Sequence, residues 1–139
     1  MIRKTIAYKD YNGIERKEDF YFNLSRAELI DMEYGTEGGY TAKLQKIADS
    51  KDAPTIMKTF KDIIMRSYGI KSDDGRTFRK SREISESFEQ SEAYSVLLME
   101  LMTDLAEGGD KAAKFINAIV NSEAAADSTA LPAVSTAKA

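Results

Sequence analysis

Two short runs of alternating polar and apolar residues flank a strong turn signal at the start of the chain, and this pattern limits the available folds. Apolar side chains occupy even positions in residues 2–8 and again in residues 14–24, which is the period of strands with one buried face. Between the runs lies Asn12-Gly13, whose residues tolerate the positive φ of a tight turn. We therefore expect a β-hairpin over residues 2–24. Because a lone hairpin is only marginally stable, its apolar face must pack on helices or on another chain.

Helical periodicity dominates the remainder of the sequence. Ser25 and Glu28 have the spacing of a capping box, so a helix should begin at Arg26. Asp52-Ala53-Pro54 resembles a cap with proline in the first turn, and Ser91 can cap a further helix. The expected helices cover residues 26–34, 40–50 and 53–68, a short segment around Ile84 and Phe88, residues 91–105, and residues 112–120.

Glycines and polar segments separate these helices. Gly35 and Gly69 are placed to end the first and third of them. Residues 70–82 are polar and predict a loop, with a tight turn at Asp73-Asp74-Gly75. Alanine, serine and threonine dominate residues 121–139, and a segment of that composition buries too little apolar surface to offset the entropy of ordering.

These elements predict a mainly α, α+β fold in which an N-terminal hairpin packs on a bundle of five or six short helices. A length of 139 residues suits one domain. We expect a single globular domain over residues 1–120, with the hairpin at 2–24 and the helical part at 25–120. A flexible, disordered tail is expected over residues 121–139.

Composition excludes several classes of site. The sequence contains no cysteine and no histidine, so it has neither a thiolate nor an imidazole for catalysis or metal binding. A net charge of -3, from nearly balanced charges, provides no electrostatic footprint for nucleic acid and no basic anchor for a membrane. No apolar run is long enough for a signal peptide or a spanning helix. We expect a protein of the cytoplasm.

The motifs nearest to catalytic or ligand-binding patterns have simpler interpretations. The glycines of residues 35–39 lack the Gly-Lys-Ser/Thr ending of a phosphate loop, and a linker is favoured. Asp73-Asp74-Gly75 provides too few oxygens for a calcium loop. Four glutamates recur at every third position, and the basic residues just before them favour helical ion pairing over a metal or acid–base site. They are Glu83, Glu86, Glu89 and Glu92. We expect no catalytic residue, metal or cofactor.

The methionines of the helices allow two interpretations. Methionine fills irregular gaps in a core, and this is the simpler role for Met57, Met65, Met99 and Met102. The second interpretation is a groove that binds amphipathic helices of a partner, since methionine is over-represented on adaptable binding surfaces.

Four segments carry a resemblance to a known family. Residues 68–81 read YGIKSDDGRTFRKS, and they are followed by FEQSEAYS at 88–95, LMEL at 98–101 and FIN at 115–117. This pattern resembles the tail assembly chaperones of tailed bacteriophages with long, non-contractile tails. The resemblance extends from the hairpin to Ile119 and is densest between Tyr68 and Leu101.

The resemblance implies an assembly factor of the host cytoplasm that is absent from the mature virion. Such chaperones bind the tape measure protein, help recruit tail tube subunits around it, and often have a longer, frameshifted form. Because they lie in or near the resembling segments and could be incompletely buried, the candidate partner-binding residues are Phe78, Phe88, Met99 and Met102. The hairpin's exposed edges also allow a homo-oligomer.

Two other functions remain open from the sequence. One is a small structural component of the virion, such as a tail or head–tail joining protein. The other is a small enzyme that uses carboxylates and a metal, for which Glu83 to Glu92 would have to converge on a cleft. Nucleic-acid and membrane partners are not expected.

Overall fold

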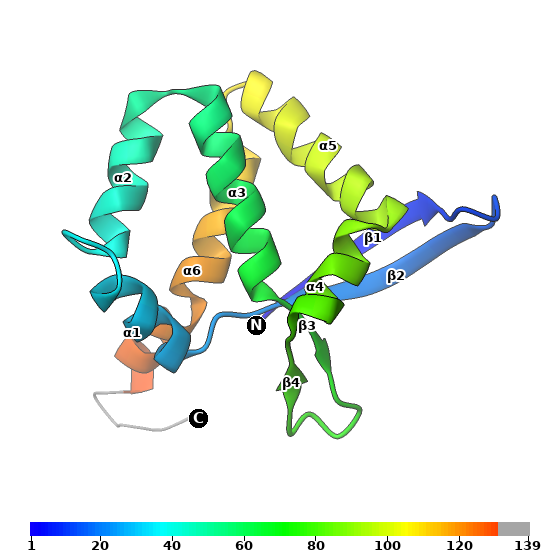
Figure 1. The fold of residues 1–139 in the computed structure, drawn as a ribbon, viewed down its shortest axis with the longest axis horizontal. Coiled ribbons are helices and arrows are strands. Elements are labelled where there is room, and N and C mark those ends of the chain that lie inside the picture. Colours follow the sequence, from blue (N-terminus) through cyan, green and yellow to red (C-terminus); the bar gives the residue numbers. More distant parts are fainter. Residues whose placement is uncertain (131–139) are drawn as a thin grey trace.

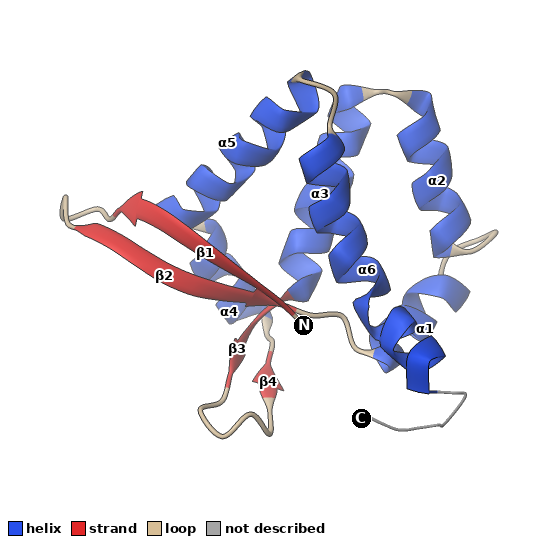
Figure 2. Cartoon of the chain, turned by 180° about the vertical axis from the view of Figure 1, so that it is seen from behind, coloured by secondary structure: helices blue, strands red, loops and turns tan. Residues whose placement is uncertain are grey.

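Two pairs of strands, each followed by three helices, make up residues 1–130, the part of the chain that the computed structural model describes, with side chains described through residue 121 (Figures 1 and 2). The elements in chain order are β1 (Ile2–Lys9), β2 (Glu15–Phe22), α1 (Arg26–Tyr34), α2 (Tyr40–Ser50), α3 (Ala53–Ser67), β3 (Tyr68–Lys71), β4 (Phe78–Arg79), α4 (Arg82–Glu89), α5 (Glu92–Ala106) and α6 (Asp110–Ala130). The predicted mainly α fold with an N-terminal hairpin is confirmed.

The N-terminal hairpin forms as predicted, with its turn at Asn12-Gly13. β1 and β2 pair antiparallel from Ile2 opposite Phe22 to Lys9 opposite Glu15. In the turn, the Asp10 carboxylate accepts hydrogen bonds from the backbone amides of Asn12 at 2.9 Å and Ile14 at 3.0 Å. The far end of the hairpin projects from the helices in both views (Figures 1 and 2).

The sheet contains two strands that the sequence pattern did not reveal. β3 continues directly from α3 and pairs antiparallel with the end of β2, with Phe22 opposite Tyr68. β4 pairs with β3, giving the order β1-β2-β3-β4. The prediction of a loop over residues 70–82 is therefore wrong at both ends, because strands of four and two residues are too short to display a period. The predicted turn between them is present, and Asp74 accepts hydrogen bonds from the Ser72 hydroxyl and the Arg76 amide.

Gly69 has a different role from the helix stop that was predicted. It lies inside β3, where a β-carbon would come within 2.6 Å of the Phe78 ring and 2.8 Å of the Arg79 carbonyl oxygen. Glycine is therefore required for the close approach of β3 and β4 rather than for ending α3. α3 ends because the chain turns into a strand at Tyr68.

The helix starts agree with the sequence at two of the three predicted caps, Ser25 and Ser91. The Ser25 hydroxyl accepts from the Glu28 amide at 3.1 Å and the Glu28 carboxylate accepts from the Ser25 amide at 2.8 Å, which completes the capping box. Ser91 caps α5. Asp52 occupies the cap position of α3, but its side chain makes no backbone cap bond and accepts from the Thr55 hydroxyl instead.

α6 is longer than the sequence suggested. It continues from Asp110 to Ala130, through the point where the tail was expected to begin. Alanine has the highest intrinsic helix propensity, so an alanine-rich segment can extend a helix that is already nucleated. The remainder of the expected tail, residues 131–139, lies outside the described residues.

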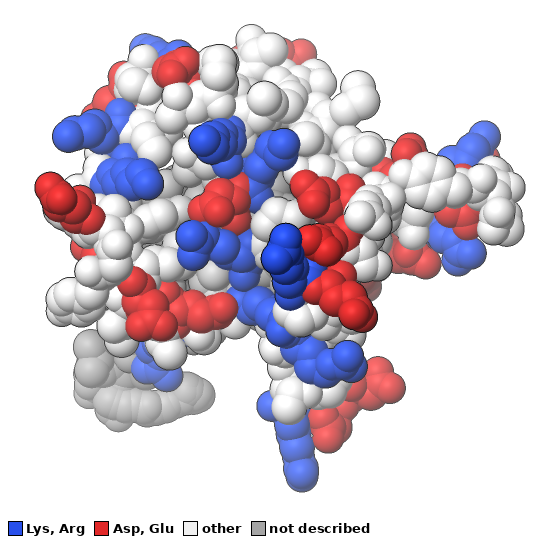
Figure 3. Space-filling view, in the orientation of Figure 1, with Lys and Arg blue, Asp and Glu red and all other residues white. Residues whose placement is uncertain are grey.

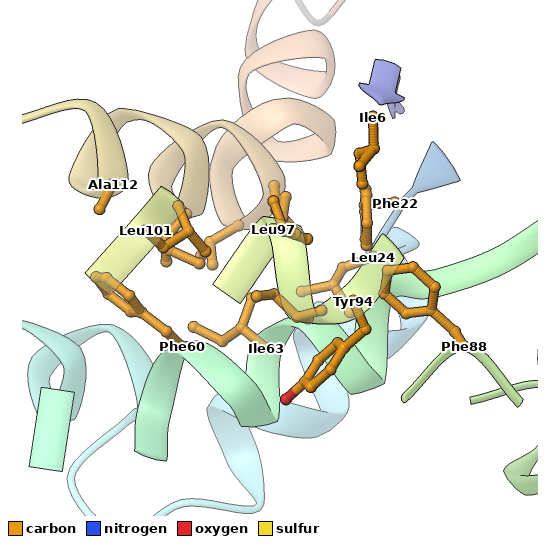
Figure 4. Packing of buried hydrophobic residues seen from close by; sticks show 14 of the residues in the cluster. Ile6, Phe22, Leu24, Phe60, Ile63, Phe88, Tyr94, Leu97, Leu101 and Ala112 are labelled. Carbon is orange, nitrogen blue, oxygen red and sulfur yellow. The ribbon is translucent and has the colours of Figure 1, made fainter. Parts of the chain in front are cut away.

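The core lies between the sheet and the helices α3, α5 and α6 (Figure 4). Its centre is aromatic: the Phe88 ring stacks on Tyr68 with centroids 4.2 Å apart, and Phe22 meets Phe88 at 5.9 Å and Phe115 at 5.6 Å. Aliphatic side chains complete the core, and those that are almost fully buried are Leu24, Ile63, Ile64, Leu97 and Ile119.

One ammonium group joins three elements at the base of this core. Lys80 Nζ donates to the Glu28 carboxylate of α1 at 2.8 Å, to the Asn23 carbonyl after β2 at 2.6 Å, and to the Arg66 carbonyl near the end of α3 at 2.9 Å. Partial burial opposes ionisation of Glu28, but the hydrogen bonds from Lys80 and Ser25 outweigh it and lower the pKa of that carboxyl.

Replacing this lysine should destabilise the fold in a pH-dependent way. We expect Lys80→Met to lower the free energy of unfolding by about 1–2 kcal/mol at pH 7, since a charged hydrogen-bond donor is lost at a partly screened site. A carboxyl with a lowered folded pKa contributes stability above its unfolded pKa of about 4.3. The difference from wild type should therefore shrink as pH falls through the lower folded pKa of Glu28.

Urea unfolding followed by circular dichroism at several pH values measures this difference. Lys46→Met, which removes an exposed lysine from α2, is the matched control and should change stability by less than about 0.5 kcal/mol. A Lys80→Met deficit that stays constant down to pH 3 would show that the ion pair contributes nothing.

Candidate partner-binding surface

Phe88 belongs to the core, so the expectation that it is incompletely buried is wrong. It is 3% exposed and lies at the end of α4, where its ring contacts Tyr68, Phe22 and Tyr94. The strand β3, which the sequence did not predict, covers the Phe88 ring through Tyr68. Phe88 can therefore affect a binding surface only by supporting the residues packed over it, not by contacting a partner.

Phe78 is half-buried on β4, away from the helical candidates. Its ring lies against Gly69 on the neighbouring strand, with Lys80 Nζ 5.8 Å from the ring centroid. The β3–β4 hairpin lies at the start of α4, whereas α5 follows the end of α4 (Figure 1). Phe78 and the methionines therefore cannot form one continuous contact.

Met99 and Met102 lie one turn apart on α5, and both interpretations of the methionines apply here. Met102 is half-buried against the core, whereas Met99 is 70% exposed. Val96, one turn before Met99, is exposed as well. We call Val96, Met99 and the outer part of Met102 the α5 face. The surface over α5 carries few charges in Figure 3.

The α5 face is exposed because α5 is apolar on more than one side. Its inner side packs on β1, α4 and α6 through Tyr94, Leu97 and Leu101. On the side toward β1, Glu100 pairs with Lys4 at 3.1 Å. Val96 was not singled out from the sequence, although its spacing of three from Met99 could have indicated it.

Two further apolar features were missed by the sequence reasoning. Ile30 and Tyr34 lie four residues apart on α1 and are 55% and 87% exposed. α2 and α3 enclose an open groove of about 310 Å³, and we call it the α2–α3 groove. Its lining residues are Tyr40, Lys43, Leu44, Ile47, Thr55, Lys58, Thr59 and Asp62.

The glutamate run does not converge on a cleft. Glu83, Glu86 and Glu89 are exposed on α4, and Arg82 pairs with Glu86 at 3.0 Å, as expected for helical ion pairing. Within the part of the chain that the structure describes, no three acidic side chains are grouped so that they could hold a metal ion.

A comparison with protein families decides how these surfaces are interpreted. A model described as phage tail assembly chaperone matches residues 1–136. The chain belongs to the phage tail assembly chaperone family. No curated protein and no solved structure gives a significant match. The family is not a class of enzymes, and a tail assembly chaperone acts on the proteins of a phage tail.

The described part of this chaperone also lacks any helix with the length and apolarity needed to cross a membrane.

The free energy of unfolding can test the assignment of Phe88 to the core and Met99 to the surface of this chaperone. Phe88→Ala should lower the free energy of unfolding by about 3–5 kcal/mol, since it leaves a cavity in the aromatic cluster. Met99→Ala should change it by less than about 0.5 kcal/mol, since the side chain is mostly in solvent.

The sequence has no tryptophan, so unfolding is best followed by far-ultraviolet circular dichroism in urea. Equal losses for the two variants would contradict the assignment of Met99 to the surface.

Proposed function

We propose that this chaperone binds the tape measure protein of its phage and keeps it soluble until tail tube subunits assemble around it. The observation that supports this most directly is the α5 face, an exposed apolar surface on a member of the tail assembly chaperone family. Large apolar side chains that gather on the surface of a small protein often mark a site of protein interaction.

The physical basis is the covering of apolar helical stripes before assembly. A long tape measure protein exposes such stripes as it is synthesised, and free stripes associate with one another. A methionine surface suits this client, because an unbranched, polarisable side chain adapts to stripes of varied sequence. Val96 and Met99, three residues apart on α5, place two apolar side chains on neighbouring turns of the same helix, where a client stripe can contact both.

The candidate contacts have unequal roles in this proposal. Met99 is the principal contact, with Val96 and the outer part of Met102 beside it. Phe78 can contribute only a separate contact on the β3–β4 hairpin. Phe88 does not touch the client and acts by supporting the cluster on which α4 and α5 pack.

The proposal predicts that polar substitution of the α5 face weakens chaperone activity without unfolding the protein. Co-expression of the wild type with a tape measure fragment should raise the soluble fraction of the fragment severalfold. Val96→Ser combined with Met99→Ser should remove most of that gain, because two apolar anchors are lost.

Ile14→Ser, at an exposed apolar position of the hairpin, is the matched control and should keep full activity. Thermal unfolding of each variant verifies its fold. If the wild type leaves the fragment as insoluble as expression alone does, the proposed function fails. If the wild type keeps the fragment soluble and the double serine variant does so equally well, the choice of surface fails.

We further propose that the chaperone acts in the host cytoplasm and leaves the tail before the virion is complete. An assembly factor should be absent from purified virions by quantitative mass spectrometry, whereas a structural component would be present at a fixed ratio to the tail tube protein. Detection at such a ratio would favour the alternative of a tail or head–tail joining protein.

A further inference from the structure

We propose that the α2–α3 groove binds an amphipathic helix flanked by acidic residues, as a second contact between this chaperone and its tail-protein client. The inference rests on the proposed function for the identity of the client. The chemistry of the helix follows from the groove itself.

The floor of the groove is apolar apart from the Tyr40 hydroxyl, and its two threonine hydroxyls are already engaged. Tyr40 is buried, and Leu44 and Ile47 are half-buried along the inner side of α2. The Thr59 hydroxyl donates to the Thr55 carbonyl at 2.9 Å, and the Thr55 hydroxyl donates to Asp52. A ligand in the groove therefore meets apolar carbon and few free hydrogen-bonding groups, which suits leucine-like side chains.

The rim of the groove is positively charged. Lys43 on α2 and Lys58 on α3 are exposed among its lining residues, and neither ammonium group forms an ion pair or hydrogen bond with the described residues. The acidic residue at the rim, Asp62, is paired with Arg66 at 2.9 Å.

The surrounding sequence reinforces this charge. Residues 40–62 hold five lysines and three aspartates, although the whole chain has a net charge of -3. Figure 3 shows basic side chains spread over α2 and α3. Acidic residues beside an apolar stripe would complement this rim, and such complementarity raises the association rate and fixes the register of binding.

The dimensions of the groove fit part of a helix. A volume of about 310 Å³ accommodates the apolar side chains of one helical turn, while the rest of the helix would lie outside. α2 packs on α1 and α3 and has one buried residue, so the groove is not filled by the core.

Other occupants match the groove less well. Residues 131–139 contain Leu131 and Val134 but no acidic side chain, and they carry Lys138. Nucleic acid would match the lysines but not the apolar floor, and Tyr40, the only aromatic side chain of the lining, is buried and leaves little ring surface for base stacking.

The test uses the full chain and two synthetic helical peptides of about five turns. Both peptides carry leucine at positions i, i+3, i+4 and i+7, and they differ in having either glutamate or lysine at the flanking positions. Fluorescence anisotropy measures the affinity of each, and amide shifts in NMR spectra locate the site.

We expect the acidic peptide to bind at least tenfold more tightly than the basic peptide, with shifts confined to α2 and α3. Lys43→Glu with Lys58→Glu should weaken acidic-peptide binding about tenfold, since two attractions become repulsions. Ile47→Ser should weaken both peptides. Lys9→Glu with Lys111→Glu makes the same change in net charge at exposed sites outside the groove lining and should alter affinity by less than about twofold.

Three results would overturn the inference. The first is equal affinity for both peptides, or shifts outside α2 and α3. The second is an equal loss with the control charge reversals, which would indicate a general field effect. The third is displacement of the acidic peptide by a DNA oligonucleotide, or tighter peptide binding after deletion of residues 131–139, since each would identify another occupant.

Failure of this inference can be separated from failure of the proposed function. If the wild type keeps the tape measure fragment soluble but the acidic peptide does not occupy the groove, only the groove inference is lost. If the acidic peptide occupies the groove but the fragment is not kept soluble, the groove stands and the tape measure protein is the wrong client.

Discussion

The contact between the Phe22, Tyr68 and Phe88 rings determines how the sheet and the helices are arranged. Phe22 comes from the N-terminal hairpin, Tyr68 from the strand that follows α3, and Phe88 from the end of α4. Aromatic rings at these separations stabilise the fold by more than the apolar area that they bury. Each of the three rings belongs to a different segment of the chain, so their contact holds these segments together. A hairpin that is marginal alone thereby becomes part of a four-stranded sheet with a helical layer.

This arrangement explains why apolar surface is left over on α5. The inner side of the helix is fully used by Tyr94, Leu97 and Leu101 against the sheet and α6. Met99 lies on another side of the helix and is 70% exposed. Stability does not require an apolar residue at such a position, which is why the proposed client contact is placed there.

The sequence predicts much of this fold because its signals are local. Asn12-Gly13, the capping box at Ser25, and the stripe of α5 each specify an element from a few residues. It fails at β3, where Tyr68 joins the sheet by pairing with the distant Phe22, and at β4, which has only two residues and so displays no period. The sequence also could not show that Phe88 is buried whereas Met99 is exposed. Periodicity identifies residues that share a face, but which of several apolar faces is covered depends on packing between elements.

The α5 face and the α2–α3 groove differ in the chemistry that they offer a client. The α5 face is uncharged and carries a flexible methionine, so it can accept many apolar stripes with little discrimination. The groove has a fixed floor and two unpaired lysines among the described residues, so its binding depends on shape and charge. A chaperone for a long helical client benefits from both properties. Under the two proposals, adaptable contact would protect stripes of varied sequence, and a charged groove would fix where along the client the chaperone is held. Because the two surfaces lie on different helices, substitutions in one need not disturb the other, and each role can be measured separately.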